Sequence, residues 1–196
     1  MKKFKDYLLE GFLIVFSVLF ALFIQNYAEG RKTDKQKVVA LERIKREIER
    51  NAKVLSEWLP HHQGIHARLT NAVENKNDSL RIKLSLYNLF NFGVLTNDKQ
   101  IIQTLLGSTA WETARTTGII NEFDFELVEH LTQTYFLQNT LMTSVNGIAA
   151  VYFEASTHDL KNLDTTLKQL EIRFQEITGQ ENFLNEAYRD VLMKLN

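Results

Sequence analysis

The sequence predicts an all-α protein, with one N-terminal transmembrane helix followed by an antiparallel helical bundle that carries short crossing helices. Three observations support this fold class. The 196 residues include one proline and eight glycines, so residues that break helices are few. Residues 11–24 form an uncharged apolar run. Most of the later sequence repeats apolar residues at spacings of three and four, the period of an amphipathic helix.

The apolar run predicts a helix that crosses a membrane. Residues 11–24 alone would span roughly 21 Å at about 1.5 Å per residue. The flanking residues from Tyr7 to Ala28 lengthen this helix to about 33 Å, enough for a hydrocarbon core near 30 Å. Tyr7 and Tyr27 lie where an interfacial aromatic belt is expected.

Two other interpretations compete with a membrane anchor. A cleaved secretory signal has the same charged start and short apolar core, but its cleavage site needs small residues at alternate positions, and residues 26–28 offer one. A buried core helix would need partners for four phenylalanines, which we expect all around the helix: Phe12, Phe16, Phe20 and Phe23. We therefore favour the anchor.

A stripe of small and polar residues follows one side of the predicted membrane helix. It consists of Glu10, Ser17, Ala21, Gln25 and Ala28, which fall close to one line at 3.6 residues per turn. Small residues let helix backbones approach, and polar ones hydrogen-bond across membrane interfaces. We hypothesise that the stripe packs against another membrane helix, from a partner or a second copy. The alternative is that lipid tolerates the small residues and the polar ones mark the membrane boundaries.

Basic residues flank the apolar helix on both sides. Lys2, Lys3 and Lys5 precede it, and four basic residues follow between Arg31 and Lys37. The larger count after the helix favours a cytoplasmic bundle domain. A short basic tail before an apolar core is, however, the usual form of an export signal, and long domains translocate largely regardless of charge. We expect the bundle domain on the extracytoplasmic side.

We divide the chain into residues 1–30, a basic tail with the transmembrane helix, and residues 31–196, a water-facing helical-bundle domain. The domain starts with a helix whose apolar residues step by three and four over residues 41–59. Pro60 is expected to end it, because proline lacks an amide hydrogen and clashes with the preceding turn. This helix could continue from the membrane segment as one rod, although Gly30 weakens the join.

The middle of the domain predicts short helices, which we expect across one end of the bundle. They are residues 61–74, 79–90, 98–106 and 110–117, with a loop at 91–96. Thr109 and Glu112 have the spacing of a capping box at the start of the last of these helices.

The C-terminal part predicts long helices. The first covers residues 125–153, and Ser156 to Asp159 looks like a capped break after it, although the helix could also run on. The next covers residues 160–177 and is expected to end at Gly179, because glycine readily adopts the left-handed conformation. A last helix is expected over residues 184–195.

No catalytic or metal-binding motif stands out. His62 and His66 are four residues apart with His61 adjacent, but no third or fourth metal ligand lies nearby in the sequence. We interpret them as an exposed polar turn after Pro60. A phosphate loop, a nucleophile elbow and a zinc-protease motif are all missing from the sequence. We expect no enzymatic activity, no metal and no cofactor.

Two further glutamate–histidine pairs have a spacing of four: Glu126 with His130, and Glu154 with His158. We expect hydrogen-bonded pairs there, because di-iron bundles use a spacing of three. The formal net charge of −1 provides no field that would attract nucleic acid.

The stretch from Gln103 to Tyr135 is more apolar than short helices usually need. Trp111, Ile120 and Phe123 are the candidates there for contact with a partner protein. Core packing is the alternative explanation, and we favour it.

Two blocks of sequence resemble a known family. Residues 20–29, Phe-Ala-Leu-Phe-Ile-Gln-Asn-Tyr-Ala-Glu, followed by Arg31-Lys32, are similar to the membrane exit of an uncharacterised bacterial family of small single-pass membrane proteins. Residues 108–118 and 127–135 are similar to its second shared block. Tyr27 stands where that family usually has tryptophan. The resemblance implies a bacterial membrane anchor and no catalytic residues.

We therefore expect a non-catalytic, single-pass protein of the bacterial inner membrane. Its partners are the lipid bilayer and either another membrane protein or its own copy, with a role in protein–protein interaction or assembly. The alternative is a sensory or small-ligand-binding helical module that signals through a partner. An enzyme with an unrecognised site is a third class.

Overall fold

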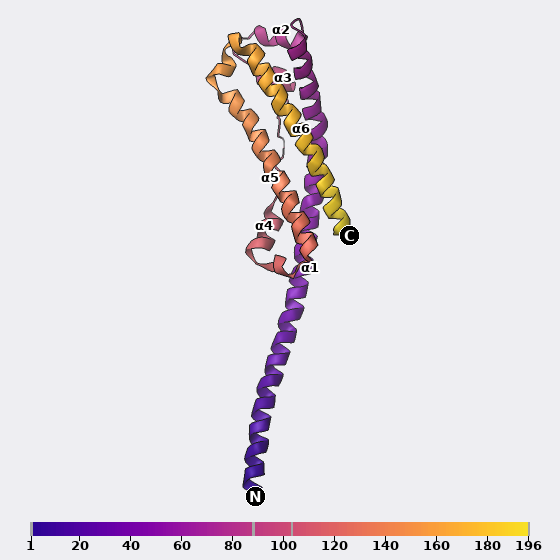
Figure 1. Cartoon of the computed structure of the whole chain (residues 1–196), viewed down its shortest axis with the longest axis vertical. Helices are drawn as coiled ribbons and strands as arrows, with labels where there is room; N and C mark the ends of the chain where they lie inside the picture. Colours follow the sequence, from indigo (N-terminus) through magenta and orange to yellow (C-terminus); the bar gives the residue numbers. More distant parts are fainter. Residues whose placement is uncertain (1, 88, 103, 196) are drawn as a thin grey trace.

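The computed structural model describes residues 2–87, 89–102 and 104–195. Over these residues the regular structure is helical and includes no strand, which confirms the all-α prediction. Three long helices dominate: α1 (Lys2–Glu74), α5 (Phe125–Phe153) and α6 (Leu163–Lys194). Helix α6 packs against both α5 and the second half of α1, and Figure 1 shows it antiparallel to both, while the first half of α1 projects alone.

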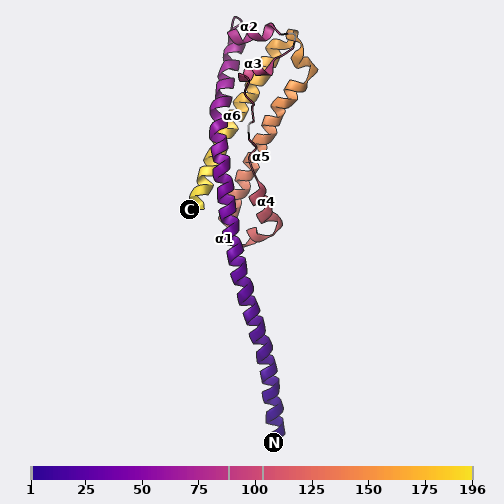
Figure 2. The same ribbon diagram turned by 180° about the vertical axis from the view of Figure 1, so that it is seen from behind.

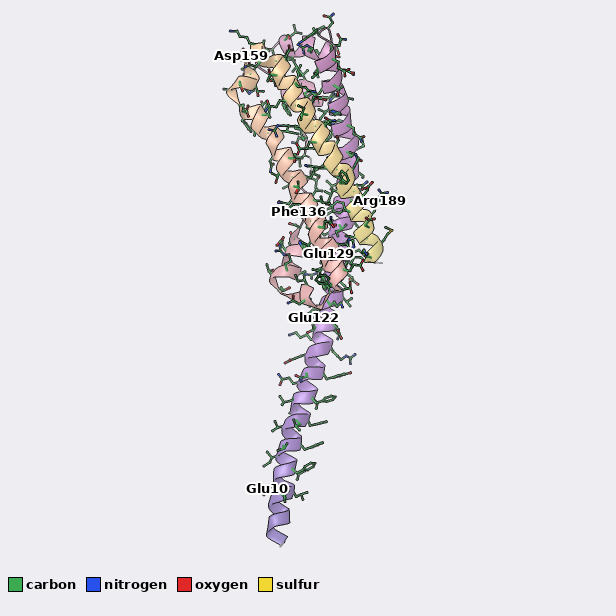
Figure 3. All side chains as sticks on the ribbon, in the orientation of Figure 1. Glu10, Glu122, Glu129, Phe136, Asp159 and Arg189 are labelled. Carbon is green, nitrogen blue, oxygen red and sulfur yellow. The ribbon has the colours of Figure 1, made fainter. Side chains whose placement is uncertain are left out.

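The short elements lie at both ends of the bundle, whereas we expected them at one. They are α2 (Ser79–Ser85), α3 (Phe92–Thr96), α4 (Thr109–Thr116) and the 3₁₀ helices η1 (Ile119–Glu122), η2 (Ala155–His158) and η3 (Leu160–Asn162). Figures 1 and 2 place α2 and α3 towards the end farthest from the N-terminus and α4 where α1 enters the bundle. In Figure 3, Glu10 marks the projecting helix, Glu122 the near end and Asp159 the far end.

Helix α1 continues through both Gly30 and Pro60, so the expected end at Pro60 is wrong. Proline inside a helix removes one hydrogen bond and costs about 3 kcal/mol. The proline side chain is exposed to solvent. Trp58 before it and Ile65 after it are buried in the core. Tertiary packing on both sides of the proline therefore holds the helix together. The separate helix expected over residues 61–74 is part of the same rod.

Helix α6 continues through Gly179 in the same way, so the two C-terminal helices expected from the sequence are one. Ile177 and Leu184, on either side of the glycine, are fully buried. The break between α5 and α6 is confirmed. Glu154 leaves the helical conformation there, and the buried Thr157 hydroxyl donates to the Val151 carbonyl at 2.5 Å.

Between the start of α2 and the start of α4, the structure differs from the prediction at three places. The predicted helix over residues 98–106 is irregular backbone in its described part, and the predicted loop at 91–96 is α3, capped by the Asn91 side chain. Helix α2 ends at Ser85, earlier than predicted. The end predicted for the helix over residues 110–117 is confirmed, because α4 ends at Thr116 and Gly118 follows with a left-handed φ of 74°.

The core runs along the axis of the bundle between α1, α5 and α6. Fully buried side chains come from all three helices, among them Ile44, Ile48, Leu55, Ile65, Leu69, Leu131, Leu141, Ile148, Leu167, Leu170, Phe174 and Leu184. This core starts where Ala40 and Leu41 of α1 first pack against it. Residues 8–32 of α1 are all exposed, and Figure 1 shows this part of the helix projecting alone.

Candidate functional site

The projecting half of α1 exposes a continuous apolar surface. Large apolar side chains from Leu8 to Tyr27 are each 49–67% exposed. None of the most apolar window of this helix is buried by the rest of the chain, so it is not a core helix of this bundle. Monomeric water-soluble proteins rarely expose so much contiguous apolar surface. One long apolar N-terminal helix of this kind is compatible with a single-pass membrane protein.

The phenylalanines of this helix do not surround it, which corrects our expectation. Phe12 stacks on Phe16 with ring centroids 6.2 Å apart, and Phe16 stacks on Phe20 at 6.0 Å. The three rings therefore share one face. The exposure of the whole apolar segment, and not the placement of its phenylalanines, excludes a core helix of this bundle.

The stripe of small and polar residues is exposed along its length: Glu10, Ser17, Ala21, Gln25 and Ala28. Its two best hydrogen-bond donors already have partners within α1. The Ser17 hydroxyl donates to the Leu13 carbonyl at 2.7 Å, and the Gln25 amide donates to the Glu29 carboxylate at 2.9 Å. The small residues Ala21 and Ala28 would let another helix approach closely. Association through this stripe stays a prediction.

A basic segment joins the apolar helix to the bundle. Arg31 lies over the ring of Tyr27, with its guanidinium carbon 5.8 Å from the centroid, a cation–π geometry. The twelve-residue step from Ala28 to Ala40 corresponds to about 18 Å of helix. The bundle is therefore held close to the end of the apolar segment.

A buried carboxylate on α1 organises the near end of the bundle. Glu47 accepts hydrogen bonds from the backbone amides of Ala110 at 2.8 Å and Trp111 at 3.4 Å, at the start of α4. It also accepts the Tyr135 hydroxyl at 2.8 Å. Burial, and then the negative charge of Glu47, raise the pKa of Tyr135 well above its usual value. The capping box expected from Thr109 and Glu112 is absent, and Glu47 caps α4 instead.

A second buried polar group lies one turn further along α1. Asn51 accepts from the Gly107 amide at 2.8 Å and donates to the Gly107 carbonyl at 2.7 Å. Gln138 of α5 donates to the same carbonyl at 3.0 Å and accepts the Tyr188 hydroxyl of α6 at 2.7 Å. These hydrogen bonds connect α1, α5 and α6 with the irregular segment before α4. Burial raises the pKa of Tyr188, so its hydroxyl stays protonated as a donor.

The proposed contact residues Trp111, Ile120 and Phe123 belong mainly to the core. Trp111 is 3% and Phe123 8% exposed, while Ile120 is half-buried. The Trp111 ring lies parallel to the Tyr135 ring with centroids 5.4 Å apart. Core packing, the favoured interpretation, is what this structure shows for two of the three. A partner has access only to part of Ile120.

His62 is fully buried, so the interpretation as an exposed polar turn is wrong. Its Nδ1 lies 2.6 Å from Oε1 of Glu181, and its Nε2 lies 3.0 Å from the Ile101 carbonyl oxygen. A carbonyl only accepts, so Nε2 carries a hydrogen, and one further proton lies between Nδ1 and the carboxyl group. Trp58 and Phe174 pack against the ring.

The other histidines lie apart from any group of metal ligands. His66 lies 3.6 Å from Glu171. His130 lies 3.6 Å from Glu126, close to its expected partner but beyond hydrogen-bonding distance. His158 contacts the Tyr152 carbonyl at 2.8 Å and not the expected Glu154. Within the described residues, no cluster of three or more histidine, aspartate or glutamate side chains could hold a metal ion.

Sequence analysis missed Glu47 and Glu181, although each carried a signal. Glu47 lies on the apolar stripe between Ile44 and Ile48, and Glu181 lies on the stripe between Ile177 and Leu184. A charged residue on the buried side of an amphipathic helix needs a partner. The partner itself could not be found without the fold.

Comparison of the chain with protein-family models, curated proteins and solved structures gave no match.

Proposed function

We propose that this chain is a non-catalytic, single-pass protein of the bacterial inner membrane whose helical bundle binds another protein or supports an assembly. The observation that carries the proposal is the continuity of α1. One helix begins as an exposed apolar segment and ends as part of the bundle core, without a hinge at Gly30. A rigid connection of this kind holds the bundle at a set height above a membrane.

The apolar surface and its flanks support the membrane part of this proposal. Water does not favour so large an exposed apolar surface, and lipid removes that cost. Tyr27 and Arg31 form an aromatic and basic border at the end of the apolar segment. The resemblance of residues 20–29 to a bacterial single-pass family supports the compartment.

Carbonate extraction of cell membranes tests the anchor. The full chain is expected to remain in the membrane pellet. Lysines in place of Val15, Leu19 and Leu22 are expected to release it, because each charge at a membrane centre costs about 2.5–3.5 kcal/mol. The matched control replaces three exposed apolar residues of α6, Ile172, Phe183 and Met193, which should leave the chain in the pellet. Extraction of the unaltered chain by carbonate would contradict the proposal.

Thiol labelling tests on which side of the membrane the bundle lies. The chain has no cysteine, so Gln175→Cys introduces a single thiol at an exposed position of α6. A maleimide that cannot cross membranes should label this variant in intact spheroplasts if the bundle is extracytoplasmic. Labelling only after lysis would place the bundle in the cytoplasm.

Continuity of α1 also supports a sensory module as a second candidate, because a rod that enters the core would couple motion in the membrane to the bundle. Purification of the full chain from native membranes separates the two candidates. A stably copurified protein supports interaction or assembly, whereas a copurified small molecule detected by mass spectrometry supports the sensory candidate.

A further inference from the structure

Most of α5 lacks charged residues. From Leu131 to Phe153 this helix contains no charged residue, although charged residues make up 24% of the chain. The exposed surface of α6 shows the contrast, because it carries Lys168, Glu186 and Arg189. Interface cores in proteins are depleted of charge and enriched in aromatic residues.

The uncharged stretch of α5 also exposes large aromatic side chains. Phe136 is 67% and Phe153 79% exposed, and Phe125, which precedes the uncharged stretch, is 83% exposed. Phe125 and Phe136 border a shallow depression whose lining includes the charged Glu129, so the uncharged stretch of α5 begins beyond that residue. Phe136, labelled in Figure 3, lies near the middle of α5. A surface that exposes two phenylalanines on an uncharged stretch of helix is a candidate interface.

The exposed positions follow the spacing of a helix–helix seam. The uncharged face of α5 consists of Thr132, Phe136, Asn139, Thr143, Asn146 and Ala150. It ends towards the N-terminus at Thr132, because the next position on the same line is the exposed Glu129. These positions alternate steps of four and three, the heptad spacing by which two helices pack side by side. Thr143 and Ala150 are small enough for close approach.

We propose that the uncharged face of α5 pairs with the same face of a second copy, in a parallel two-fold contact. The parallel direction rests on the proposed membrane anchor. Two copies inserted in one membrane with the same orientation can be related only by an axis along the membrane normal. Their α5 helices then run in the same direction, and each residue of the seam faces its own counterpart.

Self-pairing accounts for the missing charge. In a parallel two-fold contact, any charged residue on the seam would face a residue of its own sign, which is destabilising. A different partner would impose no such condition, since it could offer the opposite charge. The asparagines suit the same arrangement, because an amide both donates and accepts, so Asn139 and Asn146 can each hydrogen-bond to their own counterparts.

Single cysteines in the cysteine-free full chain test the contact in membranes. Thr143→Cys places a thiol on the seam, and Gln175→Cys places one on the exposed face of α6 as the matched control. Mild oxidation should give about tenfold more disulfide-linked dimer for Thr143→Cys, because a disulfide needs Cα atoms within about 7 Å. Equal yields at the two positions, or no dimer from Thr143→Cys, would overturn the proposal.

Charge variants at Phe136 test whether like residues face each other. Phe136→Glu or Phe136→Lys, each in the Thr143→Cys chain, should lower the dimer yield. Co-expression of the two chains should restore it, because glutamate then faces lysine. Unchanged circular dichroism would show that the exposed substitution leaves the fold intact. A dimer yield that neither charged substitution lowers, or a crosslink to a protein of different mass, would reject self-pairing.

Membrane extraction of the same samples separates this inference from the proposed function. If the chain stays in the carbonate pellet but Thr143→Cys gives no dimer, the membrane anchor is supported and the α5 contact is rejected. If carbonate extracts the chain, the membrane anchor is rejected. The dimer yield of Thr143→Cys then still decides whether the uncharged face of α5 pairs with itself.

Discussion

The imidazole of His62 on α1 and the carboxyl group of Glu181 on α6 lie 2.6 Å apart, between Nδ1 and Oε1, and both side chains are 0% exposed. This contact crosses the interface between the two helices that define the long axis of the bundle. Glu181 Oε2 has no hydrogen-bond partner within the described residues. The pair therefore depends on one short contact in a buried environment.

Removal of one member of this pair should destabilise the bundle strongly. Glu181→Ala leaves a buried imidazole nitrogen without its partner, and we expect a loss of about 3 kcal/mol in the free energy of unfolding. The double variant His62→Leu with Glu181→Leu should lose less than the sum of the single variants. Denaturant unfolding in detergent, followed by circular dichroism, measures both. Glu186→Ala, at an exposed position of α6, is the control and should change stability by less than about 0.5 kcal/mol. Additive losses would show that the pair is not coupled.

Glu47→Gln should loosen the start of α4. The substitution removes the negative charge at the helix N-terminus and replaces one acceptor oxygen by a donor, next to the amides of Ala110 and Trp111. We expect a loss of about 1–3 kcal/mol. Hydrogen exchange should become faster at the amides of the first turn of α4. Glu49→Gln, at an exposed position of α1, is the matched control. Unchanged exchange at Ala110 would argue against capping by Glu47.

Pro60→Ala should stabilise the protein. The proline side chain is exposed, so its removal forfeits little packing, and alanine supplies the missing amide hydrogen within α1. Helix propensities suggest a gain of about 1–3 kcal/mol. Thermal unfolding of the full chain in detergent measures it, with Gln63→Ala as an exposed control on the same helix. A lower melting temperature would mean that the proline serves the packing of α1 on α6.

Acidification should destabilise the wild-type protein more than a His61→Gln variant. Burial, and then the positive charges of His62, Lys99 and Arg68, lower the pKa of His61 below its usual value near 6.5. Below that usual value the unfolded chain takes up a proton that the folded chain resists. The free energy of unfolding therefore falls as the pH drops through the unfolded pKa towards the folded one. Denaturant midpoints at neutral and mildly acidic pH should differ more for wild type. Equal pH dependence of the wild-type and His61→Gln midpoints would exclude His61 as a source of the acid destabilisation.

Sequence patterns predicted the helical class because they depend on local spacing. The steps of three and four over residues 41–59 and 160–177 lie within α1 and α6, except that the second helix begins at Leu163. The break after Phe153 and the stop at Gly118 were likewise local, since backbone conformation at one or two residues decides them. Helix ends at Pro60 and Gly179 were predicted from the same local rules and were wrong.

By itself, the sequence determined that the chain is helical and that its N-terminal helix is long and apolar enough to cross a membrane. Both depend on residue type and period alone. Tertiary structure decided that α1 passes Pro60, because burial on both sides outweighs one lost hydrogen bond. It also decided the partners of Glu47 and His62, because these residues lie 63 and 119 positions from Ala110 and Glu181, and only the fold brings such groups together.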